Sequence, residues 1–146
     1  MDDKTILAEK ATHSYTVCFH QDCPLSDHCL RHLVGKHAPA TLETCTSVNP
    51  NAKGTATKRC PHYRTSQKQK MAQGMKNIFN DNMPQRVEKG VRQELIRRTN
   101  RQYYYEYRSG VRLIPPAMQE EIRELFRQLG WTEEIHFDNY TEQYNW

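Results

Sequence analysis

The strongest apolar periodicity in the chain lies between residues 115 and 130. Apolar side chains recur there at intervals of three and four, which is typical of a helix with one buried face. A proline at 115 or 116 suits the first turn of this helix, and Gly130 is placed to end it. The buried face is predicted to carry Met118, Ile122, Leu125, Phe126 and Leu129.

Two further helices are predicted in the middle of the chain. The first covers about residues 66–80, and its apolar stripe consists of Met71, Met75, Ile78 and Phe79. The second begins at Pro84, and Val87, Val91 and Leu95 repeat along it every four residues. Much of its remaining surface is cationic, so we expect one face to be buried and the rest to be charged.

Residues 101–116, RQYYYEYRSGVRLIPP, predict a β-hairpin. Aromatic and β-branched residues lie on both sides of the Ser-Gly pair at 109–110, and glycine adopts the positive φ that a tight turn requires. Tyr103, Tyr105 and Tyr107 alternate along the first strand and would form one face of the hairpin. The predicted fold class is therefore α+β and mainly helical, with three to four helices and one β-hairpin.

Residues 1–64 contain all five cysteines and show little periodicity. A short helix is predicted in LSDHCLRHLV, residues 25–34, with Ser26 as its cap. This helix is too small to form a hydrophobic core alone. We therefore expect a single domain over residues 1–146, in which the cysteine- and histidine-rich segment packs against the helices and hairpin of residues 65–146.

The first residues of the chain do not have the character of a secretory signal. MDDKTILAEK is acidic where a signal is positively charged, and no segment approaches the roughly 20 apolar residues of a membrane span. We therefore expect a cytoplasmic protein without a membrane partner. Because thiols stay reduced in that compartment, the cysteines are predicted to be metal ligands or small packed side chains rather than disulfides.

Residues 18–34, CFHQDCPLSDHCLRHLV, contain three cysteines and three histidines within seventeen residues. Four thiolates can converge on one zinc ion if a loop, the short helix and the turn CPHYR bring them together. The predicted zinc ligands are Cys18, Cys23, Cys29 and Cys60. Cys45 is the odd cysteine of the five. The chain lacks the close C-x2-C pair of many zinc sites, so packing cysteines without metal, and one or two disulfides, stay open as alternatives.

His28 and His32 form a rival set of ligands. They are four residues apart, so a helix over residues 25–34 would place both on one face, where they could hold one zinc ion. The metalloprotease form of this motif has a glutamate directly after the first histidine, and here that position is Cys29. Iron-sulfur binding is a further alternative, although the cysteine spacing matches neither ferredoxin pattern.

Four segments of the chain carry a resemblance to a known family. Residues 18–34, CPHYR at 60–64, YYYEYRSGVRLIPP at 103–116 and FDNYTEQYNW at 137–146 look, in this order, like a group of small uncharacterised bacterial proteins classed as a domain of unknown function. The similarity covers nearly the whole chain. It implies C-x4-C-P-x4-C and C-P-H-Y-R as the shared cysteine pattern, with Cys45 outside it. It implies no activity.

The net charge of +4 conceals a strong asymmetry along the chain. Residues 50–114 contain fifteen Lys/Arg and four Asp/Glu, whereas residues 115–146 contain two and seven. A basic block of this kind is one mark of nucleic-acid binding, but the acidic end could fold back and neutralise it. We expect any such binding to be weak and to be lost at physiological salt. The candidate phosphate contacts are Arg97, Arg98, Arg101, Arg108 and Arg112.

The chain has no catalytic signature. It contains no phosphate-binding glycine loop, no serine elbow and no zinc-protease motif, so no catalytic residue is predicted. The leading interpretation is a small binding or regulatory module with a structural zinc site, acting on a protein partner or on nucleic acid. The alternatives are an enzyme or a redox or metal sensor that uses a reactive cysteine or a catalytic metal, and a weak nucleic-acid-binding protein.

Overall fold

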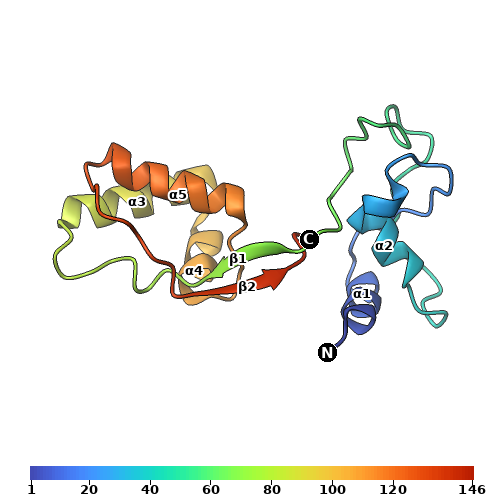
Figure 1. Ribbon diagram of the computed structural model, residues 1–146, viewed down its shortest axis with the longest axis horizontal. Helices are drawn as coiled ribbons and strands as arrows, with labels where there is room; N and C mark the ends of the chain where they lie inside the picture. Colours follow the sequence, from blue (N-terminus) through green and yellow to red (C-terminus); the bar gives the residue numbers. More distant parts are fainter. The chain divides into compact units, whose positions relative to one another are not determined.

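Figure 1 shows a computed structural model that describes residues 1–146. It contains five α-helices, one 3₁₀-helix and a two-stranded antiparallel sheet, which confirms the predicted α+β, mainly helical class. The chain forms two compact units: unit 1 comprises residues 1–68 and 144–146, and unit 2 comprises residues 69–143. The single domain expected over the whole chain stays a prediction. None of the helices combines the length and apolar character needed to cross a membrane.

Three helices enclose the core of unit 2: α3 (Gln85–Arg98), α4 (Arg101–Ser109) and α5 (Pro116–Gln128). Helix α3 contacts both of the others. The helices predicted after Pro84 and at Pro115 or the following residue are confirmed as α3 and α5, because apolar periodicity and a proline start agree in each. Their buried residues include the predicted Val87, Val91, Leu95, Ile122, Leu125 and Phe126.

The sheet of unit 2 joins two segments that are far apart in the sequence. Strand β1 (Gln69–Gln73) pairs antiparallel with β2 (Asn139–Gln143), and Met71 lies opposite Thr141. On the other side of β1, Ile114 makes an isolated antiparallel bridge. The strands therefore close unit 2 at its two chain ends, and α5 packs against β1.

The helix predicted over residues 66–80 is wrong, because β1 occupies the middle of that segment. Met71, Met75 and Ile78 are buried as expected, but an extended strand followed by turns brings them to the core. Gly74 has a φ of 89°, a left-handed conformation that ends the strand and that a continuing helix does not contain.

The hairpin predicted over residues 101–116 is also wrong, because its first half forms helix α4. The side chain of Asn100 accepts a hydrogen bond of 2.8 Å from the backbone N–H of Tyr103 and caps the first turn. Gly110, with a φ of 84°, ends the helix in a left-handed conformation instead of forming a hairpin turn. The buried tyrosines are three residues apart, a helical spacing, and are Tyr104 and Tyr107.

Unit 1 contains α1 (Asp3–Thr12), the 3₁₀-helix η1 (Ser26–His28) and α2 (Leu30–Lys36), and α1 packs on α2. The single short helix predicted over residues 25–34 is wrong, because Cys29 is extended and separates η1 from α2. The core of unit 1 also takes in a residue from the C-terminus. Its buried members are Leu7, Ala11, Val17, Leu30, Val34 and Tyr144.

The last residues of the chain contribute aromatic contacts to unit 1. Trp146 lies edge-on to Tyr15, with 5.8 Å between ring centroids, and is tilted against Tyr144 at 5.2 Å. The Lys10 ammonium lies 4.9 Å from the Trp146 ring centroid. We expect Trp146→Ala to lower the unfolding free energy of unit 1 by about 2 kcal/mol, because it removes these contacts and a half-buried apolar surface.

Denaturant unfolding followed by NMR of the unit 1 amides measures this change. Val111→Ala is a suitable control, since the Val111 side chain is 79% exposed and belongs to unit 2. If Trp146→Ala unfolds at the same denaturant concentration as the parent protein, the C-terminus does not stabilise unit 1.

Candidate functional site

A cavity of about 340 Å³ opens in unit 1, and the four predicted zinc ligands line it. They are Cys18, Cys23, Cys29 and Cys60. Cys29 is buried, the other three are half-buried, and all are free thiols. Cys45 is exposed and does not line the cavity. The four grouped cysteines therefore line the same cavity, and Cys45 lies outside it.

Backbone hydrogen bonds hold Cys18 and Cys29 beside the start of α2. The N–H of Cys18 donates to the carbonyl of Arg31 at 3.1 Å, in the first turn of the helix. Cys29 directly precedes α2 and forms an isolated antiparallel bridge with Thr65. The start of this helix therefore carries one cysteine and holds a second one next to it.

Cys23 and Cys60 each begin a tight turn with proline as its second residue. The carbonyl of Cys23 accepts a hydrogen bond of 3.1 Å from the N–H of Ser26. The carbonyl of Cys60 accepts one of 3.2 Å from the N–H of Tyr63. Proline is favoured at the second position because its fixed φ suits the turn. Two separate Cys-Pro sequences thus form the same kind of hydrogen-bonded turn at the cavity.

Arg31 ties the segments around the cavity together. From α2, its Nε donates to the carbonyl of His62 at 2.8 Å, and its guanidinium also donates to the carbonyl of Thr16 at 2.8 Å. The guanidinium carbon lies 5.3 Å from the ring centroid of Tyr15. The side chain therefore connects α2 both to the segment before Cys18 and to the turn that begins at Cys60.

Three histidines also line the cavity: His20, His32 and His62. The Nδ1 atom of His32 is buried without a hydrogen-bond partner, so a polar atom at the cavity is unsatisfied. His28 does not line the cavity, and the break at Cys29 keeps it off the helix that carries His32. Of the two rival ligands, only His32 joins the cysteines.

The donor side chains do not meet at one point as they are placed. No three Cys, His, Asp or Glu side chains in residues 1–146 are grouped so that they could hold a metal ion. A tetrahedral zinc site needs each of its sulfur ligands about 2.3 Å from the metal. The kinds of donor therefore suit zinc, but binding requires the cavity walls to move inward.

Two aromatic side chains at the cavity were not predicted as site residues. Phe19 is 51% exposed and Tyr63 is 39% exposed, and both line the cavity. Phe19 follows Cys18 directly, and Tyr63 comes three residues after Cys60. This closeness to predicted ligands is the one signal in the sequence that could identify them, because exposure depends on tertiary packing.

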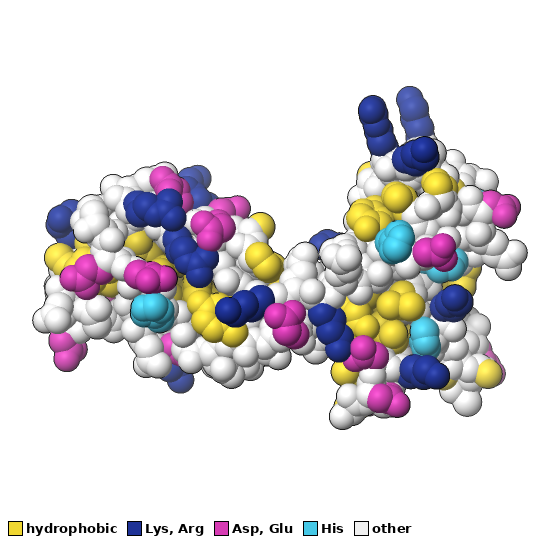
Figure 2. Space-filling view, in the orientation of Figure 1, with side chains coloured by type: hydrophobic (Ala, Val, Ile, Leu, Met, Phe, Trp, Pro, Cys, Tyr) yellow, Lys and Arg dark blue, Asp and Glu magenta, His cyan; other side chains and the backbone are white.

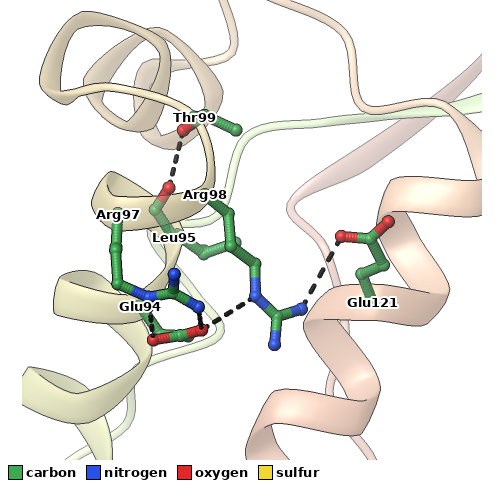
Figure 3. A network of polar contacts seen from close by, with 6 residues as sticks. All are labelled: Glu94, Leu95, Arg97, Arg98, Thr99 and Glu121. Atoms are coloured by element: carbon green, nitrogen blue, oxygen red, sulfur yellow. Dashed lines mark hydrogen bonds and ion pairs between the residues drawn. The ribbon is translucent and has the colours of Figure 1, made fainter.

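The arginines predicted to contact phosphate lie in unit 2, and three of them pair with carboxylates, two of which are shown in Figure 3. Arg97 and Arg98, at the end of α3, both bind Glu94 one turn earlier. Arg98 also reaches Glu121 of α5, at 3.7 Å. Glu121 of α5 therefore pairs with one cation of α3, whereas Glu120 and Glu124 pair with arginines of α5 itself.

The other three predicted arginines lie on aromatic rings. Arg112 is 3.7 Å from the ring centroid of Tyr103 and forms an ion pair of 2.7 Å with Glu106. The remaining pairs are Arg101 over Tyr105, at 5.7 Å, and Arg108 over Phe79, at 5.6 Å. All five of these arginines thus have partners within unit 2, and the nucleic-acid contact proposed for them stays a prediction.

The fold and the cavity define a small, mainly helical α+β protein with a cysteine-lined cavity in its N-terminal unit. Over residues 1–146 the sequence matches the family described as a family of unknown function (DUF6078), and the chain belongs to this family. Comparison with curated proteins and with solved structures gives no significant match.

The ion pairs of Glu94 shown in Figure 3 should make the stability of unit 2 depend on pH. Hydrogen bonds from Arg97, and then from Arg98, lower the pKa of Glu94 from its ordinary value of 4.5 to about 2. Because the folded-state pKa is depressed, the interaction stabilises unit 2 above pH 4.5 and is lost as the pH falls from 4.5 to about 2. NMR of the Glu94 carboxyl carbon should therefore give a midpoint near 2.

Arg97→Gln should move this midpoint upward, since it removes the largest cause of the shift. Arg92→Gln should leave it unchanged, because Arg92 lies on the same helix but forms no ion pair with Glu94. A midpoint of 4.5 in the unaltered protein would show that the arginines are not bound to Glu94 in solution.

Proposed function

We propose that unit 1 is a metal-binding module and that its ion is a structural zinc. The chain acts in this proposal as a small binding or regulatory protein, not as an enzyme. The ligands are Cys18, Cys23, Cys29 and Cys60. The observation that carries the proposal is that these four thiols line one cavity while Cys45 lies outside it.

The exposure of the thiols favours ligands over packing residues. A cysteine that serves as a small apolar side chain is among the most deeply buried residues of a protein. Cys18, Cys23 and Cys60 are only half-buried, and they border open space instead of a packed core. Free thiols in such positions are accessible to a soft or borderline metal ion.

Closure of the cavity requires the two Cys-Pro turns to approach α2. Cys18 and Cys29 are held by hydrogen bonds at the start of that helix. Cys23 and Cys60 lie in turns outside regular helices and strands, where the backbone moves at lower cost. Metal binding would therefore order the cavity walls, and its free energy would add to the stability of unit 1.

His32 supplies the alternative fourth ligand. Its Nδ1 is buried without a partner, and zinc sites with three thiolates and one imidazole are common. An iron-sulfur cluster on the four cysteines is a second alternative, because such clusters also take four thiolates. An iron-sulfur cluster absorbs visible light and a zinc ion does not, so an absorption spectrum of the purified protein distinguishes the two.

Elemental analysis of protein purified without added metal tests the proposal. We expect about one zinc per chain, and we expect a strong chelator to remove it and to unfold unit 1. Cys→Ser changes at the four ligands should each lower both metal content and thermal stability, because a hydroxyl is a poor substitute for a thiolate. Cys45→Ser is the matched control and should change neither.

The outcomes separate the competing interpretations. Absence of bound metal, with an unchanged unfolding transition in chelator, would refute the metal site and leave packing cysteines. Bound iron together with visible absorption would show that the four cysteines hold an iron-sulfur cluster instead of zinc. If one of the four Cys→Ser variants retains all of its metal while His32→Ala loses it, the His32 imidazole, and not that cysteine, is the fourth ligand.

A further inference from the structure

Unit 1 carries a group of cations without carboxylate partners. From residue 44 to residue 67 this unit contains four Lys/Arg and no Asp/Glu. Lys53, Lys58 and Arg59 are exposed in the loop that leads to Cys60, and they form no ion pair. In Figure 2, Lys and Arg side chains project from one edge of unit 1 beside hydrophobic side chains. This basic loop therefore offers positive charge that the fold leaves uncompensated.

Two exposed aromatic rings lie next to this loop, because the cavity wall contains Phe19, Tyr63 and residues of the loop itself, such as Pro50 and Thr55. The two rings are 51% and 39% exposed. Because both rings line the same cavity, they offer a ligand two aromatic faces within one concave surface.

Gly35 allows the Phe19 ring to lie close against α2. A Cβ atom on Gly35 would lie 3.3 Å from that ring and 2.8 Å from the carbonyl oxygen of Cys18, which is closer than a side chain normally allows. The ring therefore lies against α2, where any larger residue would displace it, and still keeps about half of its surface exposed. A ring held this way can stack on a ligand without first losing much rotational freedom.

We propose that unit 1 binds single-stranded nucleic acid, with bases stacked on Phe19 and Tyr63 and phosphates bound by Lys53, Lys58 and Arg59. Unpaired bases present the flat faces that aromatic rings bind, and a neighbouring row of cations attracts the backbone. A duplex hides those faces, and an acidic peptide would use the cations but not the rings. Single strands are therefore the occupant that uses both features.

The proposed nucleic-acid surface therefore lies on unit 1, not on the arginines of unit 2 that the sequence predicts. The arginines predicted from the sequence already contact carboxylates or rings of their own unit. The cations of the basic loop have no such partners. The surface also uses none of the four thiols, so it goes beyond the proposed metal site.

Fluorescence anisotropy with a labelled oligouridine of about 20 nucleotides tests the inference on the full chain. Phe19→Leu combined with Tyr63→Leu keeps apolar packing but removes the ring faces, and it should weaken binding about fivefold or more. Lys53→Gln, Lys58→Gln and Arg59→Gln together should reduce the slope of log affinity against log salt by about two, measured between about 50 and 200 mM salt.

The matched control is Tyr103→Leu with Tyr105→Leu in unit 2, because these rings are similarly exposed, at 36% and 42%. It should leave the affinity unchanged. Zinc content and circular dichroism of each variant show that unit 1 is intact, so loss of binding is distinguished from failure of the metal site. Full affinity in the Phe19/Tyr63 variant, equal binding of a duplex of the same length, or no binding by the unaltered chain would each overturn the inference.

Discussion

The hydrogen bonds of Arg31 are the constraint on which the candidate site depends. Its side chain binds two carbonyls, those of Thr16 and His62, and its own carbonyl accepts from Cys18. Arg31 thus connects α2 to two segments that are distant in the sequence, the one that carries Cys18 and the one that carries Cys60. The guanidinium suits this role because its donors have a fixed planar arrangement that an ammonium group lacks. These bonds therefore join α2 to the segments that carry Cys18 and Cys60.

The parts of the fold that could be predicted are those with strong local signals. Helices α3 and α5 have an apolar stripe of helical period and a proline at or just before the first turn, and both signals describe neighbouring residues. Strand β1 was missed because its partner β2 lies about seventy residues away, so nothing local marks it. Helix α4 was missed because Gly110 suits a hairpin turn and a helix end equally well, and the Asn100 cap decides between them.

The candidate site shows the same division between local and tertiary information. The grouping of four cysteines without Cys45 was predicted from spacing and from the family resemblance. The same four cysteines line the cavity, and Cys45 does not. The unsatisfied Nδ1 of His32 and the exposed ring of Phe19 depend on burial and on the close approach at Gly35. Those features arise from packing between segments, so no motif in the sequence predicts them.

The central claim is that four cysteines of unit 1 bind one zinc ion, and X-ray absorption at the zinc edge tests it most directly. The fine structure reports the type, number and distance of the ligand atoms without requiring a crystal. Zinc held by four cysteines would give a single shell of about four sulfur atoms at about 2.3 Å from the metal. A shell made only of nitrogen and oxygen atoms at about 2.0–2.2 Å would contradict it, because the cysteines would then not be the ligands.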